Sequence, residues 1–198
     1  MVLPGETAPN FQANAVMPNN EVKQLDFHQS AKGAYSVLFF WPFDFTFVCP
    51  TEIIAFNEAL AEFEKRGVKV FGCSIDSVFV HSAWKATPPN KGGVGDVQFP
   101  MISDVSHEIM HAYGCVNRAE HTAFRGLFVM DRELVVRHAL VNDAPLGRSV
   151  PEVLRIIDAL QHHEKHGEVC PANWKRGERA MKPSAQGVAN YLSELAKP

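Results

Sequence analysis

The chain has 198 residues, of which 46% are apolar, and this is enough to bury a sizeable core in one main domain. Its formal net charge is −3 and no basic cluster is present, which argues against a nucleic-acid partner. No apolar run is long enough to span a bilayer, and the N-terminus lacks the pattern of a signal peptide, so we expect a cytoplasmic protein without a membrane partner.

The first half of the chain predicts a hairpin followed by a βαβ unit. Turn-forming Pro, Gly and Asn separate two short apolar pieces at residues 11–16 and 22–27, which predict an N-terminal hairpin attached to a larger sheet. Residues 35–41, 50–66 and 68–75 then predict a strand, a helix and a strand. The crossover in such a unit makes its two strands parallel.

The second half of the chain continues the alternation of helices and strands. The Gly-rich loop over residues 88–95 lacks the GxxxxGK[ST] pattern of a phosphate cradle and indicates a plain turn. The remaining elements that we expect are helices over 77–87, 105–113, 149–166 and 184–196, a strand over 99–103, and a strand pair over 124–130 and 134–141.

Cys49 lies at the junction between a buried strand and a helix. Pro42 ends the strand, and Pro50 suits the first helical turn, where its missing N–H costs nothing. The free N–H groups and the dipole of a helix N-terminus favour a thiolate over a thiol. Because the helix end supplies only about 0.3–1 kcal/mol, we also expect a cation nearby. Thr46 can place a hydroxyl beside the sulfur or beside a molecule bound to it.

A structural alternative for this junction is a buried cysteine with a threonine that caps the helix. The four cysteines form no Cys-x-x-Cys, so neither a disulfide framework nor a zinc ribbon is indicated. Cys73 lies in a predicted buried strand and Cys115 at a helix end, and we interpret both as core packing. Cys170 lies in a C-terminal extension that is poor in apolar residues, and with Cys49 it has a setting that favours catalysis.

The spacing Pro42-x3-Thr46-x2-Cys49 resembles the peroxidatic motif of the peroxiredoxins. More narrowly, it is similar to the typical two-cysteine class, which includes the peroxidase subunits of bacterial alkyl hydroperoxide reductases. The resemblance covers nearly the whole chain, and its further segments are Gly92-Gly-Val-Gly95, Phe124-Arg-Gly-Leu-Phe128, Val141-Asn-Asp143, Gly147-Arg-Ser149 and His166-Gly-Glu-Val-Cys-Pro-Ala-Asn-Trp174.

This resemblance implies a thioredoxin-like α/β fold. Its central mixed sheet is flanked by helices on both faces and carries an N-terminal hairpin and a C-terminal arm. We expect the peroxiredoxin domain over residues 1–165 and the arm, which carries Cys170, over residues 166–198. The reaction that the family carries out requires no metal, haem or flavin in the chain.

The resemblance also implies a thiol-dependent reduction of hydrogen peroxide or an organic hydroperoxide. In this interpretation the Cys49 thiolate attacks the peroxide and becomes a sulfenic acid. Arg125 and Thr46 orient the peroxide and stabilise charge, and Pro42 shields the sulfenic acid from water. Glu52 and Arg148 resemble the residues that hold the catalytic arginine in place.

The second half of the implied cycle depends on the C-terminal arm. Cys170 condenses with the sulfenic acid of Cys49 to form a disulfide between the subunits of an antiparallel homodimer. A thioredoxin or a flavoprotein disulfide reductase then reduces it, and such dimers commonly assemble into a decamer. Gly92-Gly-Val-Gly95 and Tyr191-Leu192 correspond to the loop and the Tyr-Phe pair that hold the active-site helix folded in the family. Trp41 stands where the family commonly has tyrosine.

Three other functions remain open at this point. His107-Glu-Ile-Met-His111 matches the HExxH zinc motif of metallopeptidases, although Asn117 stands where the extended motif has its third histidine. A chaperone-like holdase scaffold would need no reactive cysteine. A disulfide oxidoreductase is weakened by the lack of Cys-x-x-Cys.

Overall fold

The computed structural model of the chain describes residues 1–195 and contains two compact units. The first unit covers Met1–Val150 and the second begins at Pro151. Helix α6 (Val150–His166), which the sequence analysis grouped with the first domain, begins at this division. The predicted end of the last helix at residue 196 lies outside the described residues.

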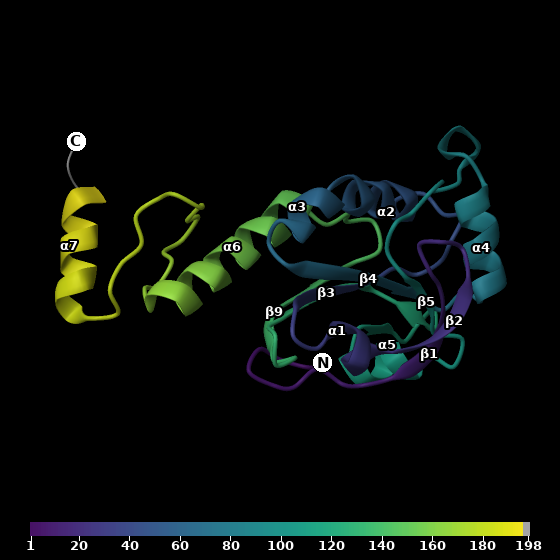
Figure 1. The fold of residues 1–198 in the computed structure, drawn as a ribbon, viewed down its shortest axis with the longest axis horizontal. Helices are drawn as coiled ribbons and strands as arrows, with labels where there is room; N and C mark the ends of the chain where they lie inside the picture. The colour runs from purple at the N-terminus through teal and green to yellow at the C-terminus, as the bar shows by residue number, and fades with distance from the viewer. Residues whose placement is uncertain (196–198) are drawn as a thin grey trace. The chain divides into compact units, whose positions relative to one another are not determined.

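The first unit is built on a seven-stranded mixed sheet with the strand order β2-β1-β5-β4-β3-β8-β9 (Figure 1). The pairs β3·β4 and β4·β5 are parallel and all other pairs are antiparallel, so the predicted βαβ unit is confirmed. The strands are β1 (Gln12–Val16), β2 (Val22–Asp26), β3 (Tyr35–Phe40), β4 (Val68–Ser74), β5 (Met101–Ser103), β8 (Arg125–Met130) and β9 (Val136–Asn142).

The predicted N-terminal hairpin is formed by β1 and β2, and β1 joins it to the sheet through an antiparallel pairing with β5. A second, two-stranded hairpin of β6 (Val116–Asn117) and β7 (Thr122–Ala123) was not predicted from the sequence. Its strands are only two residues long, too short to show an alternating pattern.

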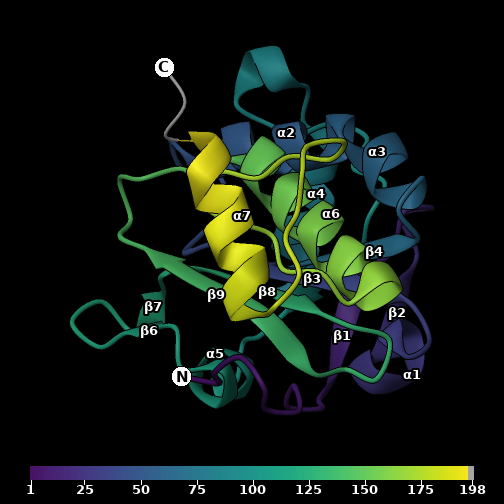
Figure 2. The same ribbon diagram turned by 90° about the vertical axis from the view of Figure 1, so that its left-hand side faces the viewer.

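Helices cover both faces of the sheet, as expected. Helices α2 and α5 lie on opposite sides of the strands in both ribbon views (Figures 1 and 2). The helices of this unit are α1 (Phe27–Ala31), α2 (Cys49–Glu58), α3 (Leu60–Glu64), α4 (Val78–Ala86) and α5 (Glu108–Tyr113), with a 3-10 turn at Pro89–Lys91. Within residues 1–195, none of the helices combines the length and the apolar character that crossing a membrane requires.

The inner strand β3 packs against both layers of helices because successive side chains of a strand point to opposite faces. The ring of Phe39 stacks on Phe56 of α2, with 4.3 Å between centroids. The next residue, Phe40, contacts Tyr113 of α5, with 5.5 Å between centroids. All six residues of β3 are buried, which explains its continuous apolar sequence.

Two predicted helix boundaries were wrong. The helix expected over residues 50–66 is divided into α2 and α3 at Ala59. Gly67, which follows α3, has a φ of 65°, as is common for a glycine at the end of a helix. The helix expected over residues 105–113 begins only at Glu108, because His107 has a left-handed φ of 64°. The carboxylate of Asp104 then accepts hydrogen bonds from two N–H groups in the first turn of α5.

The second unit contains α6 and α7 (Ala185–Leu195). The segment between them folds back on itself, since Val169 and Met181 pair through two backbone hydrogen bonds of 2.8 and 3.1 Å. Trp174, in the same segment, is 2% exposed and its indole N–H donates to the carbonyl of Glu178. The C-terminal extension is therefore ordered around a buried tryptophan.

Candidate active site

Cys49 is the first residue of α2 and follows the loop that leaves β3. Pro50 occupies the first helical turn, as the sequence predicted. Val48 is the N-cap residue and no side chain caps the helix, so the alternative in which Thr46 is a helix cap is wrong. The Cys49 side chain is 1% exposed and is a free thiol in this structure.

The strand topology brings Arg125 to Cys49. Arg125 is the first residue of β8, which runs antiparallel to β3, so the start of β8 lies at the edge of the sheet where β3 ends. Nη1 of Arg125 donates to Cys49 Sγ at 3.4 Å, and Nε donates to the Ala144 carbonyl at 2.6 Å. A buried arginine at this distance stabilises negative charge on the sulfur.

Glu52 joins Arg125 to a second buried arginine, Arg148. Glu52 lies three residues after Cys49 in α2 and is therefore on the same helical face. Its Oε2 accepts from Arg125 Nη1 at 2.6 Å and from Arg148 Nη2 at 2.9 Å. Its Oε1 accepts from the Nε and the backbone N–H of Arg148. Two guanidinium groups against one carboxylate leave a net positive charge beside the Cys49 thiol.

Arg148 also forms hydrogen bonds with the backbone of two strands, β3 and β8. Its Nη1 donates to the carbonyls of Phe40 and Gly126, at 2.8 and 2.6 Å. Burial lowers the pKa of Arg148, and the hydrogen bonds and charge of Glu52 oppose that shift. Glu52 therefore keeps a cation in a position from which water is excluded.

The loop between β3 and α2 carries the other two predicted site residues. Pro42 is buried at the end of the strand. The hydroxyl of Thr46 donates to the carbonyl of Phe43 at 2.9 Å. Because a hydroxyl has one proton and two lone pairs, this bond leaves the Thr46 oxygen able to accept a hydrogen bond from another group.

A buried polar chain that the sequence analysis missed fixes this loop. Nε1 of Trp41 donates to Asp44 Oδ1 at 2.8 Å, and Asp44 Oδ2 contacts His81 Nδ1 at 2.6 Å. The side chains of Asp44 and His81 are fully buried, and His81 Nε2 lies 3.2 Å from the carbonyl of Ile102. Burial raises the pKa of Asp44, and its hydrogen bond to His81 opposes the shift.

The direction of one hydrogen bond of His81 follows from its partner. A carbonyl can only accept, so Nε2 of His81 donates to the carbonyl of Ile102. The indole of Trp41 supplies a hydrogen bond at the position where the family commonly has a phenol. No local sequence pattern marks this pair, because the two residues are 37 positions apart.

The remaining cysteines lie in different surroundings. Burial raises the pKa of Cys73 well above its ordinary value and that of Cys115 to about 12, so both remain protonated at neutral pH. Cys170 belongs to the second unit, where it is partly exposed and donates to the Ala159 carbonyl at 3.5 Å.

The HExxH sequence does not form the geometry of its zinc motif. His107 precedes α5 in a left-handed conformation, whereas His111 lies inside the helix, so the two rings do not share one helical face. Among residues 1–195, no group of three or more His, Cys, Asp or Glu side chains is arranged to hold a metal ion.

Comparisons with known proteins agree with this arrangement. Residues 4–139 match the AhpC/TSA family, and residues 159–194 match the C-terminal domain of 1-Cys peroxiredoxin. The chain is 51% identical to alkyl hydroperoxide reductase C of Buchnera aphidicola from Acyrthosiphon pisum over 197 residues, which cover 99% of this chain and 100% of the relative. It is 52% identical to alkyl hydroperoxide reductase C of Helicobacter pylori over 190 residues, with 94% of each covered.

A solved structure shows the same fold. The reduced 2-Cys peroxiredoxin of Plasmodium vivax superposes with a TM-score of 0.94 at 46% sequence identity, covering 98% of this chain and 100% of the other. The expected thioredoxin-like mixed α/β architecture is thereby confirmed.

Proposed function

The chain belongs to the AhpC/TSA family and is a peroxiredoxin, and we propose that its thiol-dependent peroxidase activity reduces hydrogen peroxide and organic hydroperoxides at Cys49. The observation that carries this proposal is the hydrogen bond from Arg125 Nη1 to Cys49 Sγ inside a buried cluster of net positive charge. A thiolate is the nucleophile in such a reaction, and a buried cation favours it.

In the proposed first step, the Cys49 thiolate attacks the terminal oxygen of the peroxide. The S–O bond forms as the O–O bond breaks, and the alkoxide or hydroxide leaves as an alcohol or water after taking up a proton. Cys49 is oxidised to a sulfenic acid. Arg125 stabilises the charge that develops on the breaking bond, and the Thr46 oxygen accepts a hydrogen bond from the peroxide O–H. Pro42 limits the access of water to the sulfenic acid.

In the proposed second step, the thiolate of Cys170 attacks the sulfenic acid of Cys49. The products are a disulfide and water, and a dithiol donor then supplies the two electrons that restore both thiols. We propose a thioredoxin or a flavoprotein disulfide reductase as this donor, in the reducing environment of the cytoplasm. Cys49 and Cys170 belong to different subunits in this scheme, as in an antiparallel homodimer.

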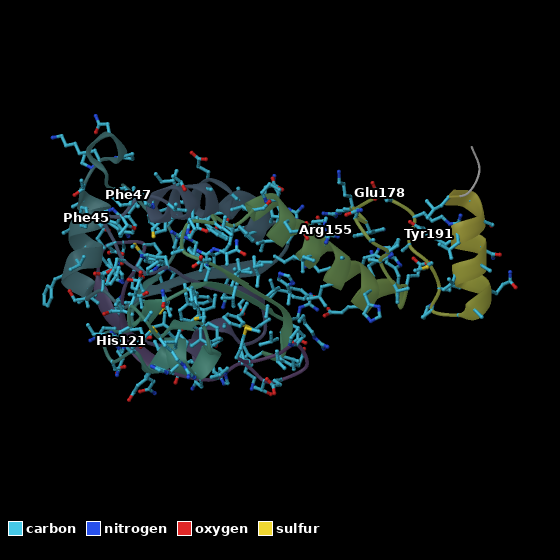
Figure 3. The ribbon with its side chains drawn as sticks, turned by 180° about the vertical axis from the view of Figure 1, so that it is seen from behind. Phe45, Phe47, His121, Arg155, Glu178 and Tyr191 are labelled. Carbon is cyan, nitrogen blue, oxygen red and sulfur yellow. The ribbon has the colours of Figure 1, made fainter. Side chains whose placement is uncertain are left out.

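We further propose that the dimers assemble into a decamer through aromatic side chains beside the active site. Phe45 and Phe47 lie two positions apart on the loop before Cys49 (Figure 3), and they are 50% and 94% exposed. Phe43 and Phe79 are 40% and 82% exposed. Asp44 and His81 connect the loop to α4, which carries Phe79. Several large exposed apolar side chains on connected elements favour an interaction surface here.

The peroxidase assignment is tested by following peroxide consumption with dithiothreitol as the donor. Cys49→Ser should lose turnover, while Cys170→Ser should still consume one equivalent of peroxide per chain in a single-turnover experiment. Peroxide consumption by Cys49→Ser at the wild-type rate would remove Cys49 from the mechanism. Retention of a holdase activity by that variant would separate the scaffold function from the chemistry.

A further inference from the structure

Cys170 is held in a compact turn on the surface of α6. Its thiol donates to the carbonyl of Ala159, at 3.5 Å, and the backbone N–H of Trp174 donates to the carbonyl of Pro171, at 3.1 Å. Val169, the residue just before Cys170, pairs through its backbone with Met181. The position of the Cys170 sulfur is therefore set by contacts within its own unit.

Arg155 of α6 binds the backbone of this turn. Its Nη1 donates to the carbonyl of Trp174, at 2.9 Å. Its Nε and Nη2 donate to the two carboxylate oxygens of Glu152, each at 2.7 Å, so the guanidinium plane is fixed. Arg155 and Ala159 are four residues apart and share one face of α6, and both the Trp174 backbone and the Cys170 thiol bind on that face.

The charges around Cys170 act in opposite directions. Burial raises the pKa of the Cys170 thiol, the cation of Arg155 lowers it and the carboxylate of Glu168 raises it. Glu168 in turn contacts His162, since its Oε2 lies 2.9 Å from His162 Nε2. Glu152 reduces the field of Arg155 because it is bound to the same guanidinium group. Arg155 is thus the cation that favours a Cys170 thiolate.

We propose that Arg155 is a positioning residue for the resolution step, which anchors the turn of residues 170–174 on α6 and supplies the charge that favours the attacking thiolate of Cys170. The inference rests on the proposed role of Cys170 as the resolving cysteine. In that step the Cys170 sulfur forms a bond to the Cys49 sulfur, the S–O bond breaks, and the oxygen leaves as water with the proton released by the thiol.

The test is the pH dependence of Cys170 alkylation by iodoacetamide in the Cys49→Ser background, with the full chain. The alkylation midpoint reports the thiolate, and the plateau at high pH reports access to the sulfur. Arg155→Met should lower the thiolate fraction at pH 7 about threefold, seen as a higher midpoint, and should raise the plateau because the turn loses its anchor on α6. Arg155→Lys should keep a midpoint close to wild type because it keeps the charge. Glu152→Gln should accelerate alkylation, because it leaves the Arg155 cation unopposed.

A midpoint that does not move in Arg155→Met, or one that moves in the same direction in Arg155→Met and Glu152→Gln, would overturn the proposal. A second measurement separates it from the proposed function. With Cys49 present, one equivalent of peroxide should form the Cys49–Cys170 disulfide about threefold more slowly in Arg155→Met. If wild type forms no such disulfide, the resolving role of Cys170 fails. If wild type forms it and Arg155→Met matches its rate, the role of Arg155 alone fails.

Discussion

Arg125 donates a hydrogen bond to the sulfur of Cys49 although the two residues are 76 positions apart in the chain. Each is the first residue of its element, Cys49 of α2 and Arg125 of β8. The antiparallel pairing of β8 with β3 places both at one edge of the sheet. The cation is therefore positioned by the most buried part of the fold, and its effect on Cys49 can be tested by substitution.

Replacing Arg125 by lysine should lower the second-order rate constant with peroxide by about a hundredfold. The arginine donates in separate directions to Cys49, Glu52 and the Ala144 carbonyl, and a single ammonium group cannot reproduce that fork. Stopped-flow measurement of peroxide reduction under single-turnover conditions gives this constant. Arg137→Lys, on β9, is the matched control and should react at the wild-type rate. A wild-type rate in Arg125→Lys would remove the residue from the mechanism.

Replacing Glu52 by glutamine should both destabilise the protein and slow the reaction. The change leaves the buried Arg125 and Arg148 without a counter-ion, and breaking a buried ion pair in this way costs about 3 kcal/mol. Urea denaturation measures the free energy of unfolding, and Glu62→Gln, an exposed carboxylate that also contacts an arginine, serves as the control. Equal stabilities for Glu52→Gln and Glu62→Gln would contradict the account of the cluster.

Thr46→Val should slow peroxide reduction by about tenfold or more, whereas Thr46→Ser should have a much smaller effect. The reason is that only the hydroxyl is required, and serine can keep the hydrogen bond to the Phe43 carbonyl and the free lone pairs of the oxygen. The same stopped-flow assay compares the two variants. Equal losses in the serine and valine variants would show that the hydroxyl is not what matters at this position.

The local architecture around Cys49 could be predicted because its signals are contiguous in the sequence. The apolar run of β3 and the proline at position 50 fix the strand and the helix start. Arg125 was identified only through the family resemblance. No local sequence pattern indicates that Arg125, at the start of β8, contacts Cys49, which lies 76 positions earlier in the chain.

The features that the sequence analysis missed depend on contacts between distant segments. The Asp44–His81 pair joins a loop to a helix 37 positions away, and neither residue alone differs from an ordinary polar side chain. The division of α2 from α3 at Ala59 breaks a segment whose apolar spacing continues across it. The late start of α5 follows from the left-handed conformation of His107, which its helical sequence pattern does not reveal.

Deleting the chain after Pro183 should make the protein resistant to inactivation by excess peroxide. The family resemblance implies that the helix containing Tyr191 and Leu192 keeps the active-site helix folded, which leaves the sulfenic acid exposed to a second peroxide. No residue of α7 is buried in the chain by itself, so the deletion removes no core packing. The peroxide concentration for half-inactivation measures the effect.

Leu192→Phe is the complementary variant, because it restores the aromatic pair of the family. The added ring is worth on the order of 1 kcal/mol of packing, so the variant should be inactivated at a peroxide concentration about fivefold lower. Leu195→Phe, at another exposed position of α7, is the control. If the truncated protein and the Leu192→Phe variant are both inactivated at the wild-type concentration, α7 has no part in this sensitivity.

The central claim is that peroxide oxidises Cys49 to a sulfenic acid and that Cys170 then forms a disulfide with it. Mass spectrometry of peptides from peroxide-treated, non-reduced protein tests this claim most directly. We predict one new linked species, in which the peptide containing Cys49 is joined to the peptide containing Cys170, and a covalent dimer on a non-reducing gel. In Cys170→Ser the linked species should disappear and Cys49 should gain oxygen instead. Oxidation confined to Cys73 or Cys115, with Cys49 unmodified, would contradict the account.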